Sequence, residues 1–101
     1  MNCKILCACA NGSGTSLMMQ MTAERVTKKL GMNVSKIHHC ALSEGVSSAT
    51  QYDIVFVPAN FKNMYDNAVK AGVTVLPLRN VMSDDEMEKA LVGCGADKKY
   101  K

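Results

Sequence analysis

A cysteine opens a short segment rich in glycine and hydroxyl residues, Cys9 to Ser16, which reads Cys-Ala-Asn-Gly-Ser-Gly-Thr-Ser. Gly12 and Gly14 permit backbone conformations that let successive N–H groups turn toward one point. Thr15 and Ser16 are natural N-cap residues, and the positive end of the helix that they would start faces the same point. A thiol held over such a loop has a pKa lowered to roughly 3.5–7.5, and its thiolate is a nucleophile. The segment therefore predicts a cysteine that reacts with a phosphate group.

We expect Cys9 to be the catalytic residue and the loop after it to bind phosphate. The predicted phosphate-binding residues are Ala10, Asn11, Gly12, Ser13, Gly14, Thr15 and Ser16. The pattern alone leaves one alternative open, namely a buried cysteine at the end of a strand, above an ordinary glycine-rich turn.

Other phosphate-binding loops fit this segment poorly. A dinucleotide fingerprint would need a third glycine where Leu17 stands, and no lysine between Lys4 and Lys28 could complete a Walker loop. A cysteine phosphatase carries an arginine six positions after its cysteine to bind the phosphoryl oxygens, and Thr15 occupies that position. A loop that accepts a phosphoryl group but transfers it poorly to water indicates a carrier.

The composition points to one soluble domain, residues 1–101, from a reducing compartment. The five cysteines form no paired spacing, and no apolar run approaches the length of a signal peptide or membrane anchor. With two Phe, three Tyr, no Trp and a net charge of +3, the chain offers no stacking platform for nucleic acid. The first predicted strand carries Cys3, Cys7 and Cys9 on one face, and a straight strand cannot bring three thiolates around one metal ion. Neither a metal nor a cofactor is therefore expected.

Hydrophobic periodicity predicts strands that alternate with helices. The strands are expected at residues 3–9, 33–40, 52–58 and 73–78, and the helices at 17–30, 61–71 and from 84 onward. The polar segment 41–51 is expected to hold at most one helical turn, at 44–49. Asn60 is a candidate N-cap for the second helix, and Ser83 with Glu86 forms a capping box before the last one.

This alternation predicts a three-layer α/β fold of the Rossmann-like or phosphatase-I-like kind. Right-handed crossovers give a four-stranded parallel sheet of order 2-1-3-4 with helices on both faces. Ligands bind such sheets beyond the carboxyl ends of the strands, where Cys9 would lie. Arg79, His38 and Asn60 are expected near the same edge, as possible contacts to the phosphate or to a partner. An exposed Arg79 paired with Asp84 or Asp85 is an equally good alternative for that residue.

The predicted helices each show one apolar face. Met19, Ala23, Val26 and Leu30 are expected in the core, whereas Leu17, Met18 and Met21 should be exposed beside the phosphate loop and dock partners. Alternatively, part of this second set packs under a neighbouring loop. The core stripes of the other two helices are predicted as Phe61, Met64, Tyr65 and Ala68, and as Met87, Ala90, Leu91 and Cys94.

The motif Cys-x-Asn-Gly-x-Gly-Thr/Ser-Ser at the end of the first strand resembles that of the IIB components of the bacterial sugar phosphotransferase system. The segment Leu78-Arg79-Asn80-Val81-Met82-Ser83 is similar to the ascorbate-type branch of that family. The chain departs from the pattern at Ala10, where relatives often have glycine. The resemblance covers nearly the whole chain, and residues 41–51 carry little of it.

The resemblance implies a cytoplasmic phosphocarrier that meets the inner face of the membrane through a partner. Cys9 would take a phosphoryl group from a phosphohistidine on a IIA protein and pass it to a sugar, L-ascorbate, held in a membrane-embedded IIC protein. Galactitol-type and pentitol-type IIB proteins share the fold and the cysteine and remain alternatives for the sugar. A small cysteine-dependent phosphatase is the more distant alternative.

Overall fold

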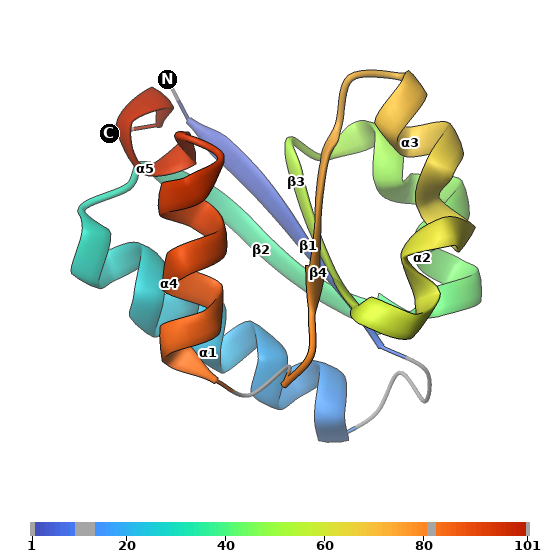
Figure 1. Ribbon diagram of the computed structural model, residues 1–101, viewed down its shortest axis with the longest axis horizontal. Coiled ribbons are helices and arrows are strands. Elements are labelled where there is room, and N and C mark those ends of the chain that lie inside the picture. The colour runs from blue at the N-terminus through green and yellow to red at the C-terminus, as the bar shows by residue number, and fades with distance from the viewer. Residues whose placement is uncertain (1, 10–13, 81–82, 101) are drawn as a thin grey trace.

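The core of the fold is a four-stranded parallel sheet. The structure, a computed structural model, describes residues 2–9, 14–80 and 83–100 (Figure 1). The strands are β1 (Cys3–Cys9), β2 (Val34–Ala41), β3 (Ile54–Pro58) and β4 (Thr74–Leu78). Their order is β2-β1-β3-β4, which confirms the predicted order 2-1-3-4.

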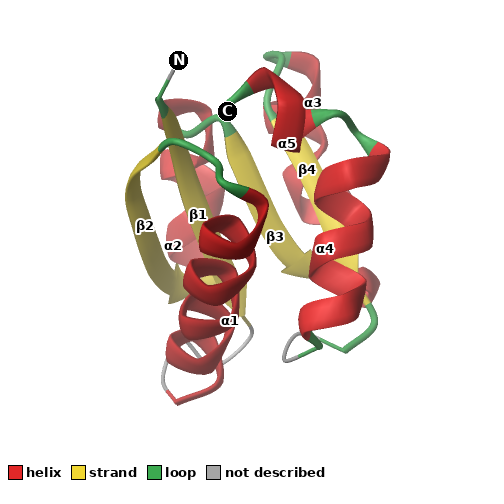
Figure 2. Cartoon of the chain, turned by 90° about the vertical axis from the view of Figure 1, so that its left-hand side faces the viewer, coloured by secondary structure: helices red, strands yellow, loops and turns green. Residues whose placement is uncertain are grey.

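Helices cover both faces of the sheet, as predicted. The helical elements are α1 (Gly14–Leu30), α2 (Leu42–Ser48), η1 (Ala49–Gln51), η2 (Ala59–Tyr65), α3 (Asp66–Lys70), α4 (Asp84–Gly93) and α5 (Ala96–Lys99), of which η1 and η2 are 3₁₀-helices. Figures 1 and 2 show α1, α4 and α5 on one face and α2 and α3 on the other.

The side chains of β1 alternate between two hydrophobic cores. Cys3, Ile5 and Cys7 pack in the core beneath α1 and α4, and Leu6 and Ala8 in the core beneath α2 and α3. A strand buried on both faces is what a continuous apolar run predicts for the middle of a parallel sheet. The position of β1 in the centre therefore follows directly from its sequence.

The predicted core face of α1 is confirmed. Met19, Ala23 and Val26 are buried, and Leu30 packs against the same core. The helix ends before Gly31, whose φ of 73° lies in the left-handed region that favours glycine. Burial of this face fixes α1 across the sheet and holds its first turn near the end of β1.

The helix predicted at 61–71 is wrong in its first half, which forms the 3₁₀-helix η2. Asn60 lies inside η2 and is not its N-cap, because Pro58 occupies that position. A 3₁₀-helix has three residues per turn, so Phe61 and Met64 lie on one side of it. Both side chains are exposed, whereas the predicted core residues Tyr65 and Ala68 are buried.

Three smaller corrections concern segment lengths and one cap. Helix α2 begins at Leu42, two residues earlier than expected. Tyr65 holds that first turn, since its hydroxyl donates a 2.9 Å hydrogen bond to the carbonyl oxygen of Leu42. Cys94 follows the end of α4 and is exposed, so it does not belong to the core stripe. Ser83 caps α4 as predicted, but the Glu86 side chain binds elsewhere.

Candidate functional site

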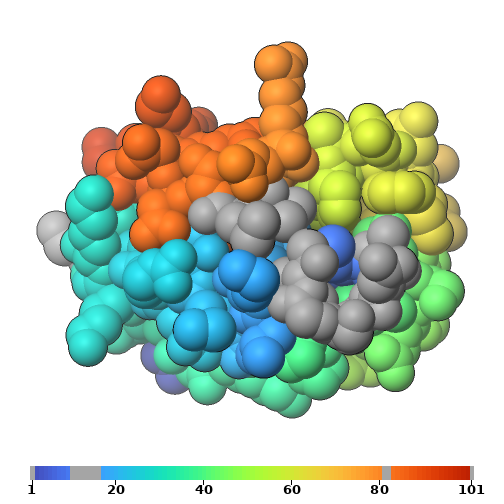
Figure 3. Space-filling view, turned by 90° about the horizontal axis from the view of Figure 1, so that it is seen from below, coloured from blue at the N-terminus to red at the C-terminus, as the bar shows by residue number. Residues whose placement is uncertain are grey.

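The carboxyl ends of the strands meet at one edge of the sheet. Cys9, the last residue of β1, pairs with Ala41 at the end of β2, and Pro58 at the end of β3 pairs with Leu78 at the end of β4. Figure 3 views the molecule from this edge and shows the end of β1, in blue, between the start of α1 and the green helix α2. The topology thus places Cys9 at the edge where such sheets bind ligands.

Cys9 is nearly buried, with 6% of its surface exposed. Alternation along β1 puts its side chain on the same face as Cys7, the face covered by α1. The chain re-enters the described region at Gly14, where α1 begins. The thiol therefore lies on the side of the sheet from which the N-terminus of α1 approaches.

Part of the predicted phosphate loop lies at the N-terminus of α1. Thr15 and Ser16 fall inside the first turn and do not cap the helix, because the helix begins one residue earlier, at Gly14. The first four N–H groups of an α-helix have no partner within the helix and attract anions. Ala10, Asn11, Gly12 and Ser13 lie outside the described residues, and their phosphate contacts stay a prediction.

Arg79 and Asn60 lie at the same edge as Cys9. Arg79 directly follows β4, Asn60 is the second residue after β3, and both are exposed. Neighbouring strands are about 4.8 Å apart, so Arg79 starts roughly 10 Å from β1, with β3 between them. Of the two alternative partners of Arg79, Asp84 pairs with Arg25 at 2.9 Å, and a pair with Asp85 stays a prediction.

The structure does not bring His38 close to Cys9. His38 pairs with Leu6, three residues before Cys9, and β2 continues to Ala41. That register places His38 roughly 10 Å before the end of the strand. Leu6 and Cys9 are three residues apart in β1, so their side chains point to opposite faces of the sheet. His38, which pairs with Leu6, therefore points to the face opposite to that of Cys9. His38 is exposed, and its contact with a partner stays a prediction.

One residue at this edge was missed by the sequence reasoning. The two carboxylate oxygens of Glu86 accept hydrogen bonds from the backbone N–H groups of Arg79 and Asn80, at 2.6 and 2.7 Å. The capping box that contains Glu86 was recognised in the sequence, but it predicts a bond to the Ser83 N–H group. That group instead donates to the carbonyl oxygen of Asn80 at 3.1 Å.

Exposed apolar side chains lie on α1 near this edge. Leu17, Met18 and Met21 are 46%, 50% and 49% exposed, as predicted, and their docking role stays a prediction. Met18 and Met21 line a cavity of about 160 Å³ together with Thr22 and Arg25. Phe61 and Met64 of η2 are a further exposed pair that the predicted α-helix placed in the core.

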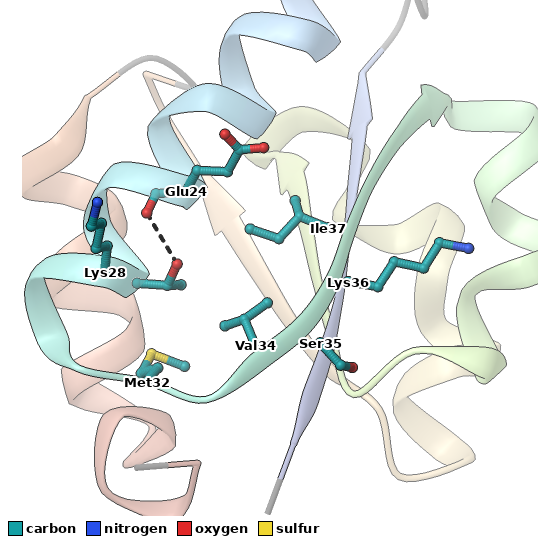
Figure 4. A pocket seen from close by; sticks show the side chains of 8 residues that line it. Glu24, Lys28, Met32, Val34, Ser35, Lys36 and Ile37 are labelled. Atoms are coloured by element: carbon teal, nitrogen blue, oxygen red, sulfur yellow. Dashed lines mark hydrogen bonds between the residues drawn. The ribbon is translucent and has the colours of Figure 1, made fainter.

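A larger cavity, of about 350 Å³, lies far from Cys9, between the last turns of α1 and β2 (Figure 4). Its lining from β2 includes Val34 and Ile37, which pair with Cys3 and Ile5 in the first half of β1. The cavity is therefore at the opposite end of β1 from Cys9. Its other lining residues are Glu24, Thr27, Lys28, Met32, Ser35 and Lys36.

Three other cysteines are held as neutral thiols by burial. Burial, followed by the charge of Asp53, raises the pKa of Cys3 from 9.0 to about 12. Burial also raises the pKa of Cys7 and of Cys40. Because the thiolate is the nucleophile, these thiols are poor candidates for covalent chemistry.

The described residues carry neither a metal-type cluster nor a membrane-spanning helix. Across 2–9, 14–80 and 83–100, no three His, Cys, Asp or Glu side chains gather as metal ligands would. No helix in the same ranges has the length and apolar character to cross a bilayer.

The fold and the site define a small three-layer α/β domain whose first parallel strand ends in a cysteine at the ligand-binding edge. Residues 4–92 match the family model described as "PTS system, Lactose/Cellobiose specific IIB subunit". The chain belongs to this family of IIB subunits of the phosphotransferase system. It is accordingly a phosphocarrier and a phosphotransferase component, as the sequence predicted.

Two known proteins illustrate the similarity. The ascorbate-specific PTS system EIIB component of Mycoplasma pneumoniae is 29% identical over 92 residues, which are 89% of this chain and 92% of that protein. The lactose-specific IIB component domain from Streptococcus pneumoniae has a similar fold, with a TM-score of 0.65 at 19% identity. The alignment covers 96% of this chain and 98% of that structure.

Proposed function

We propose that Cys9 is the residue that carries the phosphoryl group. The observation that supports this most strongly is its position as the last residue of β1, on the face of the sheet that α1 covers, with α1 beginning at Gly14. The three thiols buried deeper in the domain have raised pKa values, so Cys9 is the best-placed nucleophile at this edge.

The reaction consists of two phosphoryl transfers, the first to the Cys9 sulfur atom and the second from it. The Cys9 thiolate attacks the phosphorus of a phosphohistidine on a IIA partner, so that an S–P bond forms as the N–P bond breaks and the imidazole leaves with the electron pair. A sugar hydroxyl oxygen then attacks the same phosphorus, the S–P bond breaks with its electron pair going to sulfur as the thiolate, and the hydroxyl proton passes to solvent. N–H groups at the start of α1 would stabilise the negative charge on the phosphoryl oxygens in both steps.

The partners proposed for these steps are a IIA protein, which donates, and a membrane-embedded IIC protein, which holds the sugar. The family supports both partners because a IIB subunit works within the phosphotransferase system. A carrier that meets IIC would act on the cytoplasmic side of the membrane. We place the chain there, associated with the membrane through IIC.

We propose L-ascorbate as the sugar. The similarity to the ascorbate-specific component of Mycoplasma pneumoniae supports this choice. The family description names lactose and cellobiose instead, and these are the competing substrates.

Phosphoryl transfer in membranes would test the substrate and the reaction class together. The phosphorylated chain would be mixed with membranes containing an ascorbate-type, a lactose-type or a galactitol-type IIC protein and the matching labelled sugar. We expect sugar phosphate with ascorbate and background levels with the others. Transfer to lactose or galactitol alone would overturn the ascorbate assignment, and steady release of inorganic phosphate without IIC would favour a phosphatase.

A further inference from the structure

The carboxylate of Glu86 binds the backbone on both sides of Arg79. Its Oε2 accepts from the N–H group of Arg79 at 2.6 Å, and its Oε1 accepts from the N–H group of Asn80 at 2.7 Å. Hydrogen bonds between N–H donors and an ionised acceptor are shorter and stronger than neutral ones. Each oxygen therefore holds one of two successive peptide groups.

These two peptide groups determine the backbone conformation of Arg79. The plane of the peptide before Arg79 and the plane of the peptide after it are related only by the φ and ψ angles of this residue. A carboxylate that fixes both N–H directions therefore fixes both angles and, with them, the direction in which the Arg79 side chain leaves the backbone. Arg79 is exposed, at the edge where Cys9 lies.

Glu86 is itself held in place at the N-terminus of α4. Its backbone N–H group donates to Ser83 Oγ at 3.2 Å, which is the cap of the helix. The carboxylate is not needed for that cap, because the Ser83 N–H group binds the carbonyl oxygen of Asn80. Next to it, Asp84 is bound by Arg25, which anchors the start of α4 to α1. The carboxylate thus acts on the backbone of Arg79 from a fixed support.

We propose that Glu86 is a positioning residue for phosphoryl transfer, which acts by directing the Arg79 guanidinium toward the phosphoryl group on Cys9. The inference rests on the proposed function of Cys9. The guanidinium is a planar donor suited to phosphate oxygens, and its starting point, roughly 10 Å from β1, makes its direction decisive.

A double-mutant cycle between Glu86 and Arg79 tests this inference. The rate of transfer from a phosphorylated IIA protein to Cys9 would be measured for the wild type, Glu86→Ala, Arg79→Ala and the double variant. We expect Glu86→Ala to reduce the rate at saturating IIA by about tenfold when Arg79 is present, and by less than about twofold in the Arg79→Ala background. Should Glu86→Ala fail to fold, Glu86→Gln keeps one acceptor oxygen and should show the same pattern with a reduction of about threefold.

Glu88→Ala is the matched control. Glu88 lies on the same helix and its carboxylate is bound to Lys29 at 2.8 Å, away from the Arg79 backbone. Its removal should leave the transfer rate within about twofold of wild type. If Glu86→Ala slows transfer equally with and without Arg79, or does not slow it at all, Glu86 has no positioning role. A wild-type chain that takes no phosphate on Cys9 would instead refute the proposed function, whatever Glu86 does.

Discussion

The guanidinium of Arg25 binds the carboxylate of Asp84 through two nitrogen atoms. Its Nη2 lies 2.9 Å from Oδ1 and its Nε lies 3.1 Å from Oδ2. The pair joins α1, which follows the predicted phosphate loop, to the start of α4, which follows the segment with Arg79. These hydrogen bonds lower the pKa of Asp84 below its usual 3.8. An ion pair at the surface therefore connects the two segments on either side of the candidate site.

Replacement of Arg25 should return the pKa of Asp84 toward 3.8. A carboxyl group with a lowered pKa in the folded state adds stability above its unfolded pKa, and that contribution is lost as the pH falls through the folded value. NMR titration of the Asp84 carboxyl carbon in wild type and Arg25→Gln measures the change. Glu88→Gln, which removes the neighbouring ion pair with Lys29, should leave the titration close to wild type. An unchanged Asp84 titration in Arg25→Gln would contradict the pairing.

Gly45 should not tolerate a side chain. A Cβ atom there would meet the hydroxyl of Tyr65 and lie 3.2 Å from Cys40 Sγ. Because Tyr65 is buried, we expect Gly45→Ala to lower the free energy of unfolding by about 1–3 kcal/mol. Chemical denaturation measures this loss, and the same substitution should cost less in a Tyr65→Phe background. Equal costs in both backgrounds would show that the hydroxyl is not the obstacle.

Gly93 offers the matched control for Gly45. It also lies in a helix, its φ is not positive, and nothing lies within 4 Å of a Cβ built on it. Gly93→Ala should therefore raise the free energy of unfolding by roughly 0.4–1 kcal/mol, because alanine restricts the unfolded chain. A loss of stability there would mean that the alanine effect at Gly45 is not specific to its packing.

The domain should lose stability above pH 9. Burial raises the pKa of Cys3 from 9.0 to about 12, so the unfolded chain releases this proton first and binds fewer protons than the folded chain between these values. Stability must then fall as the pH rises. Denaturation from pH 9.0 to about pH 12, the window between the two pKa values, should show a shallower fall for Cys3→Ala than for wild type. Val26→Ala removes packing from the same core without a titrating group and should keep the wild-type slope.

Met18→Lys combined with Met21→Lys should impair docking and leave the fold intact. Both side chains are about half exposed, so the charge is not buried and the melting temperature should barely change. Loss of apolar contact should raise the IIA concentration needed for half-maximal phosphorylation roughly tenfold. Val92→Lys alters an equally exposed residue at the far end of α4 and should not affect this concentration. A fall of several degrees in melting temperature would assign the methionines to the core.

The sequence predicted the fold well where one local signal dominates. The apolar runs of β1 and β3 and the stripe on α1 each predicted the right element. Their consistency was enough to predict the order of the strands, since crossovers in such sheets are right-handed.

The sequence failed where long-range contacts decide the conformation. The spacing of Phe61 and Met64 also fits a 3₁₀-helix, which puts Tyr65 on a different side. Tyr65 is the buried member of this set, and its hydroxyl bonds to Leu42, a contact 23 residues away in the chain. Likewise, a capping box does not show that Glu86 binds the backbone of Arg79. The position of His38 follows from the register of β2 against β1, which puts it opposite Leu6, three residues before the end of β2.

The most direct test of the account is the location of the phosphoryl group. The chain would be incubated with phosphoenolpyruvate, the general phosphotransferase proteins and a cognate IIA protein, and the labelled peptide identified by mass spectrometry. We predict one phosphoryl group on the peptide that contains Cys9, stable in acid and released by iodine, with no label on Cys9→Ser and normal label on Cys94→Ser. Equal labelling of Cys9→Ser, or a phosphoryl group found on another residue, would contradict the assignment.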